Sequence, residues 1–280
     1  MAQEYAVTDR ILNCVPSKGT DRDWTIEIAA SAGLLAAPTA IPAAVDLREP
    51  WWTIGDQMDS GSCVGWGSGD GVLRWHFVKK GKLPSNQKPS VRYLWMAAKE
   101  MDEFSSYPST FIEFDGTSLK AALEIARKFG VVTDAVLPFR VPDSSGALTN
   151  ERLYRDGSAQ TFFALAAKLR VASYYNLAAN QATKLATWKS WLAANGGPIL
   201  TALQVDATWD NAKNTKGNLD VYQPSTVRGG HCVAIVGYTQ DRFIIRNSWG
   251  TGWGDKGFAY ASNAYAQAAF NEAYGVAVNP

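Results

Sequence analysis

The sequence contains little cysteine, and this scarcity excludes one class of protein. Three cysteines, Cys14, Cys63 and Cys232, are spread over 280 residues. Small secreted domains that depend on disulfide bonds carry an even and far denser set of cysteines. The chain is therefore not a disulfide scaffold, although a bridge between Cys14 and Cys232 remains open at this point.

An excess of charge of either sign is also missing. The chain has 27 basic and 26 acidic residues and a net charge of +1. Proteins that bind nucleic acid or anionic membranes through charge need a strongly basic face. We predict neither nucleic acid nor a membrane as a partner, and we interpret the basic residues at 79–82 as the solvated end of a helix.

A conventional signal peptide and a membrane-spanning run are not apparent. No early apolar stretch follows a basic segment. The Ala/Pro-rich residues 29–45 contain Pro38 and Pro42, and the run is shorter than the ~20 apolar residues that a membrane helix needs. We expect a cytoplasmic protein, with export by another route left open.

Apolar and aromatic residues are abundant, at 46% and 12% of the chain. This composition supports a sizeable core and is too apolar for a disordered protein. A length of 280 residues fits one large domain or two modest lobes.

Residues 57–66, QMDSGSCVGW, combine a turn with a cysteine at the start of a helix. Residues 59–62 predict the turn, and the apolar run that follows predicts a helix beginning at Cys63. The free N–H groups and partial positive charge of a helix N-terminus favour a thiolate, which is a nucleophile. Gln57 can place its amide beside the Cys63 N–H as a second oxyanion donor. A cysteine alone would more often be a small buried hydrophobe.

Two segments further along the chain can complete this chemistry. RGGHCVAIVGY contains His231 and FIIRNSWGTGWGDKGF contains Asn247, and each predicts a strand with a functional residue near its edge or end. Together with the Gln57–Cys63 element, these segments resemble the papain-like cysteine peptidases, in a prokaryotic-type version without a large pro-domain. The resemblance extends from about residue 41 to residue 278.

The resemblance implies an α+β, two-lobed papain-like fold with the active site in the cleft between the lobes. We expect a peptidase domain at residues 41–280, made of a helical lobe at about 41–140 and an antiparallel β-barrel-like lobe at about 141–280. Residues 1–40 form an N-terminal arm. Helices are predicted at 63–81, 90–99, 117–129, 161–169 and 182–195, and strands at 171–175, 199–205, 231–238, 243–246 and 257–261.

The resemblance also implies a mechanism that needs no metal and no cofactor. Cys63 attacks the scissile carbonyl, and His231 first takes the Cys63 proton and later protonates the leaving amine. Asn247 accepts the second imidazole N–H and fixes the ring, while Trp249 covers that hydrogen bond. The expected partner is a protein or peptide substrate, and the expected state is a monomer.

Three residues are assigned to substrate binding. Asp115 and Gly116 stand where the family's glycine strand pairs with the substrate backbone, although a plain turn is the alternative. Trp249 is the third, with a core position as its alternative. His76, the other histidine, lies well along the central helix from Cys63, and we interpret it as a core or surface residue.

The sequence departs from the family pattern in three places. Val64 replaces the aromatic residue that usually follows the cysteine, which leaves exopeptidase-like or amide substrates open. Ser60 stands where secreted members carry a disulfide-bonded cysteine, so a reducing compartment is the simpler interpretation. His231 and Asn247 also lie farther from Cys63 than the usual spacing of about 130–150 residues.

Two other functions remain open beside a cysteine endopeptidase. A protein deamidase or isopeptidase would use the same residues, and an inactive binding module would have lost the chemistry. The presence of Gln57, Cys63, His231 and Asn247 together argues against the module. Apolar residues of the arm, such as Trp24 and Leu34, are expected to be buried, either over the cleft or on the back of the β lobe.

Overall fold

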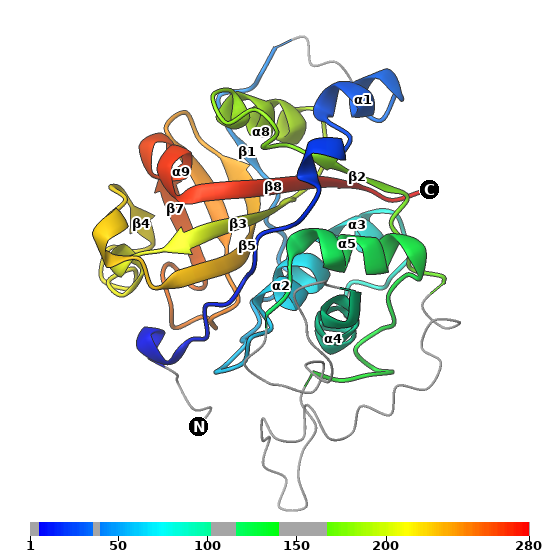
Figure 1. Ribbon diagram of the computed structural model, residues 1–280, viewed down its shortest axis with the longest axis horizontal. Helices are drawn as coiled ribbons and strands as arrows, with labels where there is room; N and C mark the ends of the chain where they lie inside the picture. The colour runs from blue at the N-terminus through cyan, green and yellow to red at the C-terminus, as the bar shows by residue number, and fades with distance from the viewer. Residues whose placement is uncertain (1–5, 36–39, 102–115, 140–166, 280) are drawn as a thin grey trace, which may run out of the picture.

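A computed structural model of the chain describes residues 6–35, 40–101, 116–139 and 167–279. Figure 1 shows a sheet beside a group of helices, with the N-terminal arm running across the boundary between them. The α+β class is thus confirmed. The loop expected at 141–160 and most of the helix expected at 161–169 lie outside the described residues, and residues 167–169 form a turn.

The helical part is built around one long central helix. This helix begins at Cys63, as the sequence predicts, and its middle is π-helical. Ser118 caps α5, because its Oγ accepts a hydrogen bond from the Ala121 N–H at 3.3 Å. The helices are α2 (Cys63–Gly65), η3 (Trp66–Leu73), α3 (Arg74–Lys79), α4 (Val91–Met101) and α5 (Leu119–Lys128).

Four alternating glycines let the central helix lie against both neighbours. A Cβ atom at Gly65 would come 2.6 Å from the Val91 carbonyl oxygen of α4, and one at Gly67 would come 2.5 Å from the Cys232 Sγ of the sheet. Gly69 and Gly71 repeat this pattern one turn later, toward α4 and the sheet respectively. Glycine is costly inside a helix, so its presence here reflects the close approach of backbone on two sides.

The sheet has eight strands in the order β2-β8-β3-β5-β6-β7-β4, with β1 beside β5. Neighbouring strands are antiparallel except β4 and β7. The strands are β1 (Val45–Asp46), β2 (Ser173–Asn176), β3 (Ile199–Val205), β4 (Asn218–Leu219), β5 (Gly229–Tyr238), β6 (Arg242–Arg246), β7 (Phe258–Ser262) and β8 (Phe270–Ala277).

Two apolar cores lie on the two sides of this sheet. One fills the space between the sheet and the central helix, α4 and α5, and it contains Cys63 and Cys232. The other lies under α8 (Lys184–Ala193) and α9 (Asn263–Ala269), around the buried Trp188 and Trp191. None of the helices in the described part of the chain is long and apolar enough to cross a bilayer.

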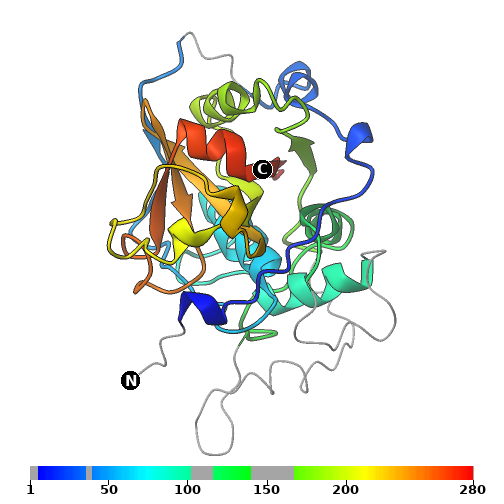
Figure 2. The same cartoon turned by 60° about the vertical axis from the view of Figure 1, so that its left-hand side comes forward.

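The N-terminal arm contacts both the helices and the sheet (Figure 2). It contains η1 (Val7–Asp9), η2 (Thr20–Arg22) and α1 (Ile26–Ser31). Its first part pairs with β5 through Asn13 and Gly230, and its later part reaches β2 through Thr25 and Asn176. The expectation that all apolar arm residues are buried was wrong, since Trp24 is 57% and Leu34 is 47% exposed. The Trp24 ring contacts the Tyr175 ring at one side, with ring centroids 6.1 Å apart.

Candidate active site

Cys63 is the first residue of the central helix and is fully buried. The preceding turn is held by Ser60, whose Oγ donates to the Gln57 carbonyl oxygen at 2.6 Å. Met58 within this turn has a φ of 56°, which a residue other than glycine seldom adopts. Such local strain is typical of functional turns, and here it accompanies the chain reversal that carries Gln57 back toward Cys63.

His231 and Asn247 are joined by a hydrogen bond. The distance between His231 Nε2 and Asn247 Oδ1 is 2.8 Å, and Oδ1 also accepts the Ser248 N–H at 2.8 Å. The two residues reach each other because β5 and β6 are adjacent and antiparallel. The second bond fixes the Asn247 amide, so its oxygen faces the imidazole ring before any substrate arrives.

Two tryptophans enclose the imidazole. The Trp249 ring lies 4.8 Å from the His231 ring at an interplanar angle of 32°, and the Trp209 ring meets it edge-on at 5.6 Å. Trp249 is 3% exposed. The rings exclude water from the His231–Asn247 bond, which strengthens it in a medium of low dielectric.

The second imidazole nitrogen is directed toward the cysteine. Within the described residues His231 Nδ1 has no hydrogen-bond partner, and the imidazole lies close enough to Cys63 to lower the pKa of its thiol. The ring therefore connects Cys63 on one side to Asn247 on the other.

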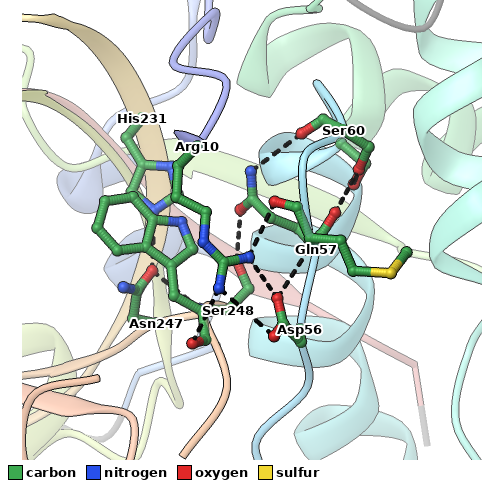
Figure 3. A network of polar contacts seen from close by, with 10 residues as sticks. Arg10, Asp56, Gln57, Ser60, His231, Asn247 and Ser248 are labelled. Carbon is green, nitrogen blue, oxygen red and sulfur yellow. Dashed lines mark hydrogen bonds and ion pairs between the residues drawn. The ribbon is translucent and has the colours of Figure 1, made fainter. Parts of the chain in front are cut away.

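Gln57 is held by the segment that follows Asn247. Its N–H donates to the Ser248 carbonyl at 2.8 Å, and its Oε1 accepts from Ser248 Oγ at 2.8 Å. Its Nε2 donates to the Ser60 carbonyl at 3.2 Å. Figure 3 shows these contacts around the labelled residues. The amide therefore has a fixed orientation, and its second N–H remains as a donor.

The surroundings of Cys63 favour its thiolate. A hydrogen bond from the Cys14 thiol lowers the pKa of Cys63 well below its ordinary value, and the hydrogen bond and charge of His231 act in the same direction. The Cys232 backbone N–H adds to them, while burial opposes them. The sequence did not indicate any role for Cys14 at this position.

The arm passes directly over this constellation. The Cys14 N–H donates to the Gly230 carbonyl at 3.0 Å, and the Val15 N–H donates to the Thr117 carbonyl at 3.2 Å. The Asn13 carbonyl oxygen would be 1.7 Å from a Cβ at Gly116. Gly116 thus lies where a backbone approaches it closely, and in this structure the backbone is that of the arm. Asp115 lies outside the described residues.

Arg10 anchors the arm beside Trp249. Its Nη1 forms an ion pair with Asp56 and donates to the Met58 carbonyl at 2.9 Å. Its Nη2 donates to the Trp249 carbonyl at 3.3 Å, and the guanidinium lies 5.9 Å from the Trp249 ring. A cavity of about 490 Å³ adjoins this anchor, lined in part by Asp56 and Trp253. Sequence reasoning missed Arg10 because an isolated Arg in an arm shows no pattern.

The second histidine also has a defined position in the structure. His76 is buried far from this constellation, and burial lowers its pKa to about 4. Among the residues that the structure describes, no three His, Cys, Asp or Glu side chains gather in a way that could hold a metal ion. The structure brings Gln57, Cys63, His231, Asn247 and Trp249 together through direct contacts, and Gly116 lies against Asn13, the arm residue next to Cys14.

Comparison with known proteins identifies the family. The model of the papain family cysteine proteases matches residues 41–277. The chain belongs to this family, and the resemblance inferred from its motifs is confirmed.

The relatives differ in how much of each chain is matched. Cathepsin B-like CP3 of Giardia intestinalis is 31% identical over 151 residues, 51% of this chain and 46% of that protein. Cathepsin L-like proteinase of Fasciola hepatica is 25% identical over 228 residues, 78% of this chain and 60% of that protein. The chain thus spans about half the length of the first relative. The fold is similar to that of xylellain, a cysteine protease from Xylella fastidiosa, with a TM-score of 0.73 at 19% identity and full coverage of both chains.

Proposed function

We propose that the protein is a cysteine peptidase that hydrolyses peptide bonds in a protein or peptide substrate. The observation that carries the proposal is the linear arrangement of a cysteine at a helix N-terminus, an imidazole, and a buried amide oxygen 2.8 Å from Nε2. This arrangement activates a thiol without a metal, because the imidazole takes the thiol proton and the amide holds the ring.

The Cys63 thiolate attacks the scissile carbonyl carbon, and the His231 imidazolium gives its proton to the leaving amine. Water then enters, His231 removes a proton from it, and the thioester between Cys63 and the acyl group is hydrolysed. Asn247 keeps the ring in plane through both proton transfers. Because each step returns one proton to His231 or removes one, the enzyme ends in its starting state.

The negative oxygen of the tetrahedral intermediate lies between two N–H donors. One is the backbone N–H of Cys63, which is among the free donors at the start of α2. The other is the second N–H of the Gln57 amide, whose first N–H donates to Ser60. Donors that are fixed in advance stabilise developing charge without having to reorganise.

We further propose that residues 1–40 restrain this activity. The support is that the backbone around Asn13 and Cys14 lies against Gly116 and Gly230, the two sides between which a substrate backbone would have to lie. The anchor of Arg10 at Asp56 and Trp249 keeps this segment in place. The arm must move before a substrate can reach Cys63.

Labelling with a thiol-directed epoxide tests the function. We expect one epoxide per chain, covalently bound to Cys63, and no labelling of a Cys63→Ala variant. Peptide products from a protein substrate then distinguish hydrolysis of the chain from side-chain deamidation, which would add only about one dalton; both are acyl-transfer reactions. Normal labelling with deamidated but uncut substrate would favour the deamidase alternative.

A further inference from the structure

All three cysteines of the chain lie near one another where the arm, the central helix and β5 meet. Cys63 starts the central helix, Cys232 follows His231 on β5, and Cys14 belongs to the arm. Cys14 and Cys63 are joined by a hydrogen bond between their thiols, and Cys14 packs against the core that contains the other two. The positions 14, 63 and 232 give no sign of this proximity in the sequence.

The backbone holds Cys14 in this place from both sides. Its own N–H is bonded to the Gly230 carbonyl at 3.0 Å, and the next N–H, of Val15, is bonded to the Thr117 carbonyl at 3.2 Å. Asn13 pairs with Gly230 in a bridge. These contacts hold the Cys14 backbone in place, next to the Cys63 thiol with which its side chain interacts.

The two thiols differ in a way that suits disulfide chemistry. Their shared hydrogen bond lowers the pKa of Cys63 and raises that of Cys14 well above its ordinary value, with burial of Cys14 as the next cause. Cys63 is thus the thiolate that reacts first with an oxidant, and Cys14 is the neighbouring thiol that can resolve the product.

We propose that Cys14 and Cys63 form a reversible disulfide that fastens the arm across the cleft. Hydrogen peroxide supplies the oxidising equivalents. The Cys63 thiolate attacks one peroxide oxygen, the O–O bond breaks, and Cys63 becomes a sulfenic acid with release of hydroxide. The Cys14 sulfur then attacks the Cys63 sulfur, the S–O bond breaks, and the Cys14 proton leaves with the hydroxyl as water. The released hydroxide takes up the proton that Cys63 had given to His231, so one peroxide and two thiols give one disulfide and two waters.

Cys232 is the competing partner, because it lies in the same apolar core as Cys63, but its side chain is packed against the central helix. The Cys232 sulfur fills the space over Gly67, at 2.5 Å from the position of a Cβ there, and Cys232 is 1% exposed. Cys14 is half-buried and belongs to a segment outside the sheet core. The arm cysteine is therefore the one free to complete the bond.

The bridge has two consequences for the enzyme. It removes the nucleophile and holds the arm in the cleft, so an oxidised chain is inactive until a thiol reductant cleaves the bond. It also protects Cys63, because a sulfenic acid that has been resolved cannot proceed to the irreversible sulfinic acid. The loss of activity rests on the proposed function, whereas formation of the bridge does not.

The first test maps the bridge in the full-length protein. The protein is treated with a small excess of hydrogen peroxide, its remaining thiols are blocked, and it is digested without reductant for mass spectrometry. We expect a peptide pair linked through Cys14 and Cys63 and a loss of about 2 Da from the intact mass. A Cys232→Ala control should form the same pair. A pair linking Cys63 to Cys232, or oxidised Cys63 without any linked peptide, overturns the proposal.

The second test measures recovery. After the same treatment, dithiothreitol should restore epoxide labelling of the natural sequence almost fully, while Cys14→Ser and Cys14→Ala variants should recover only a small part. In these variants sulfinic acid at Cys63 adds about 32 Da that reductant does not remove. Equal recovery in all proteins refutes the protective role. The two proposals can fail separately. If the protein forms the Cys14–Cys63 disulfide but cleaves no peptide, the disulfide proposal is supported and the peptidase assignment is refuted.

Discussion

In the proposed mechanism Asn247 orients the imidazole but transfers no proton, and this division of roles has a measurable effect. We predict that Cys63→Ala and His231→Ala each abolish turnover, whereas Asn247→Ala retains a measurable remnant. The remnant is expected because Trp249 and Trp209 still enclose the ring after the amide is lost. The measurement is kcat/KM on a peptide substrate, and equal losses in all three variants would contradict the assigned roles.

Gln57 is proposed as one of two oxyanion donors, so its loss should affect the transition state and leave substrate binding unchanged. We predict that Gln57→Ala lowers kcat by about 10²–10³ with little change in KM. Ser248→Ala is the matched control, because it removes the hydrogen bond to Gln57 Oε1 and leaves the donor in place. A selective rise in KM for Gln57→Ala would make Gln57 a residue of substrate binding instead.

The residues of the site differ in how far the sequence could predict them. Four of them lie in short segments whose local structure the sequence pattern predicts, namely a turn before a helix and two strand ends. These four are Gln57, Cys63, His231 and Asn247. Arg10 and Cys14 act through contacts with residues more than 40 positions away. Such contacts leave no local pattern, and the position of the arm became apparent only with the structure.

At the scale of the element, the central helix depends on its glycines. We predict that Gly65→Ala destabilises the protein by about 1–3 kcal/mol, because the added methyl meets the Val91 carbonyl, which is backbone and cannot move aside easily. Urea unfolding measures the loss. Ser68→Ala, in the same helix, adds no atoms and should change stability less. A neutral or stabilising Gly65→Ala would mean that α4 can shift away from the central helix.

The arm is attached at several points, and Arg10 holds its first part beside Asp56 and Trp249. We predict that Arg10→Ala speeds epoxide labelling of Cys63 by about 10-fold, as expected for loss of hydrogen bonds to a charged group worth roughly 1.5 kcal/mol. Arg22→Ala is the control, because its side chain is 90% exposed and distant from Asp56. An unchanged rate would leave the arm with a structural role only.

Deletion of residues 1–40 would be a less specific experiment. Ala29 of α1 is buried in the core under α8, so the deletion removes part of that core as well as the segment over the cleft. The arm has contacts of two kinds, since Asn13 lies against Gly116 and Gly230 while α1 packs beside β2.

Elements differ in predictability for a physical reason. β3 coincides with the predicted residues, Ile199–Val205, because a buried central strand is a continuous apolar run. β8, Phe270–Ala277, was not predicted, since Asn271 and Glu272 interrupt its apolar pattern at its start. Its place between β2 and β3 is decided by long-range pairing, which the local sequence does not encode.

At the scale of the whole molecule, charged side chains join the helices to the sheet. Asp70 of the central helix forms ion pairs with Arg74 and with Arg246 at the end of β6, and all three are buried. Glu124 of α5 accepts a hydrogen bond from the Tyr174 hydroxyl of β2 at 2.7 Å. The two parts are therefore connected by polar contacts in addition to apolar packing.

Glu124 should make stability depend on pH. Burial would raise its pKa, but hydrogen bonds from Arg127, Tyr174 and Lys128 outweigh burial and lower it to about 2. The folded pKa is below the unfolded one, so the stabilisation is present above pH 4.5 and is lost as the pH falls toward about 2. We predict that Glu124→Gln costs about 1 kcal/mol at pH 7, after allowance for solvent screening, and less at pH 3. Urea unfolding at the two pH values measures this, and an equal cost at both would refute the ionic explanation.

In its proposed role as a restraint, the arm belongs to the same chain as the site that it covers, and this role has a kinetic consequence. A tethered competitor acts at a fixed effective concentration, often in the millimolar range, which dilution of the protein does not change. Every substrate then binds only the fraction of molecules whose arm is displaced, so its apparent KM is divided by that one fraction. Where displacement is fast, the ranking of substrates and kcat at saturation are the same with the arm as without it. The arm therefore raises the substrate concentration that the enzyme needs for half-maximal turnover. The preference among substrates is determined by the residues that contact the substrate.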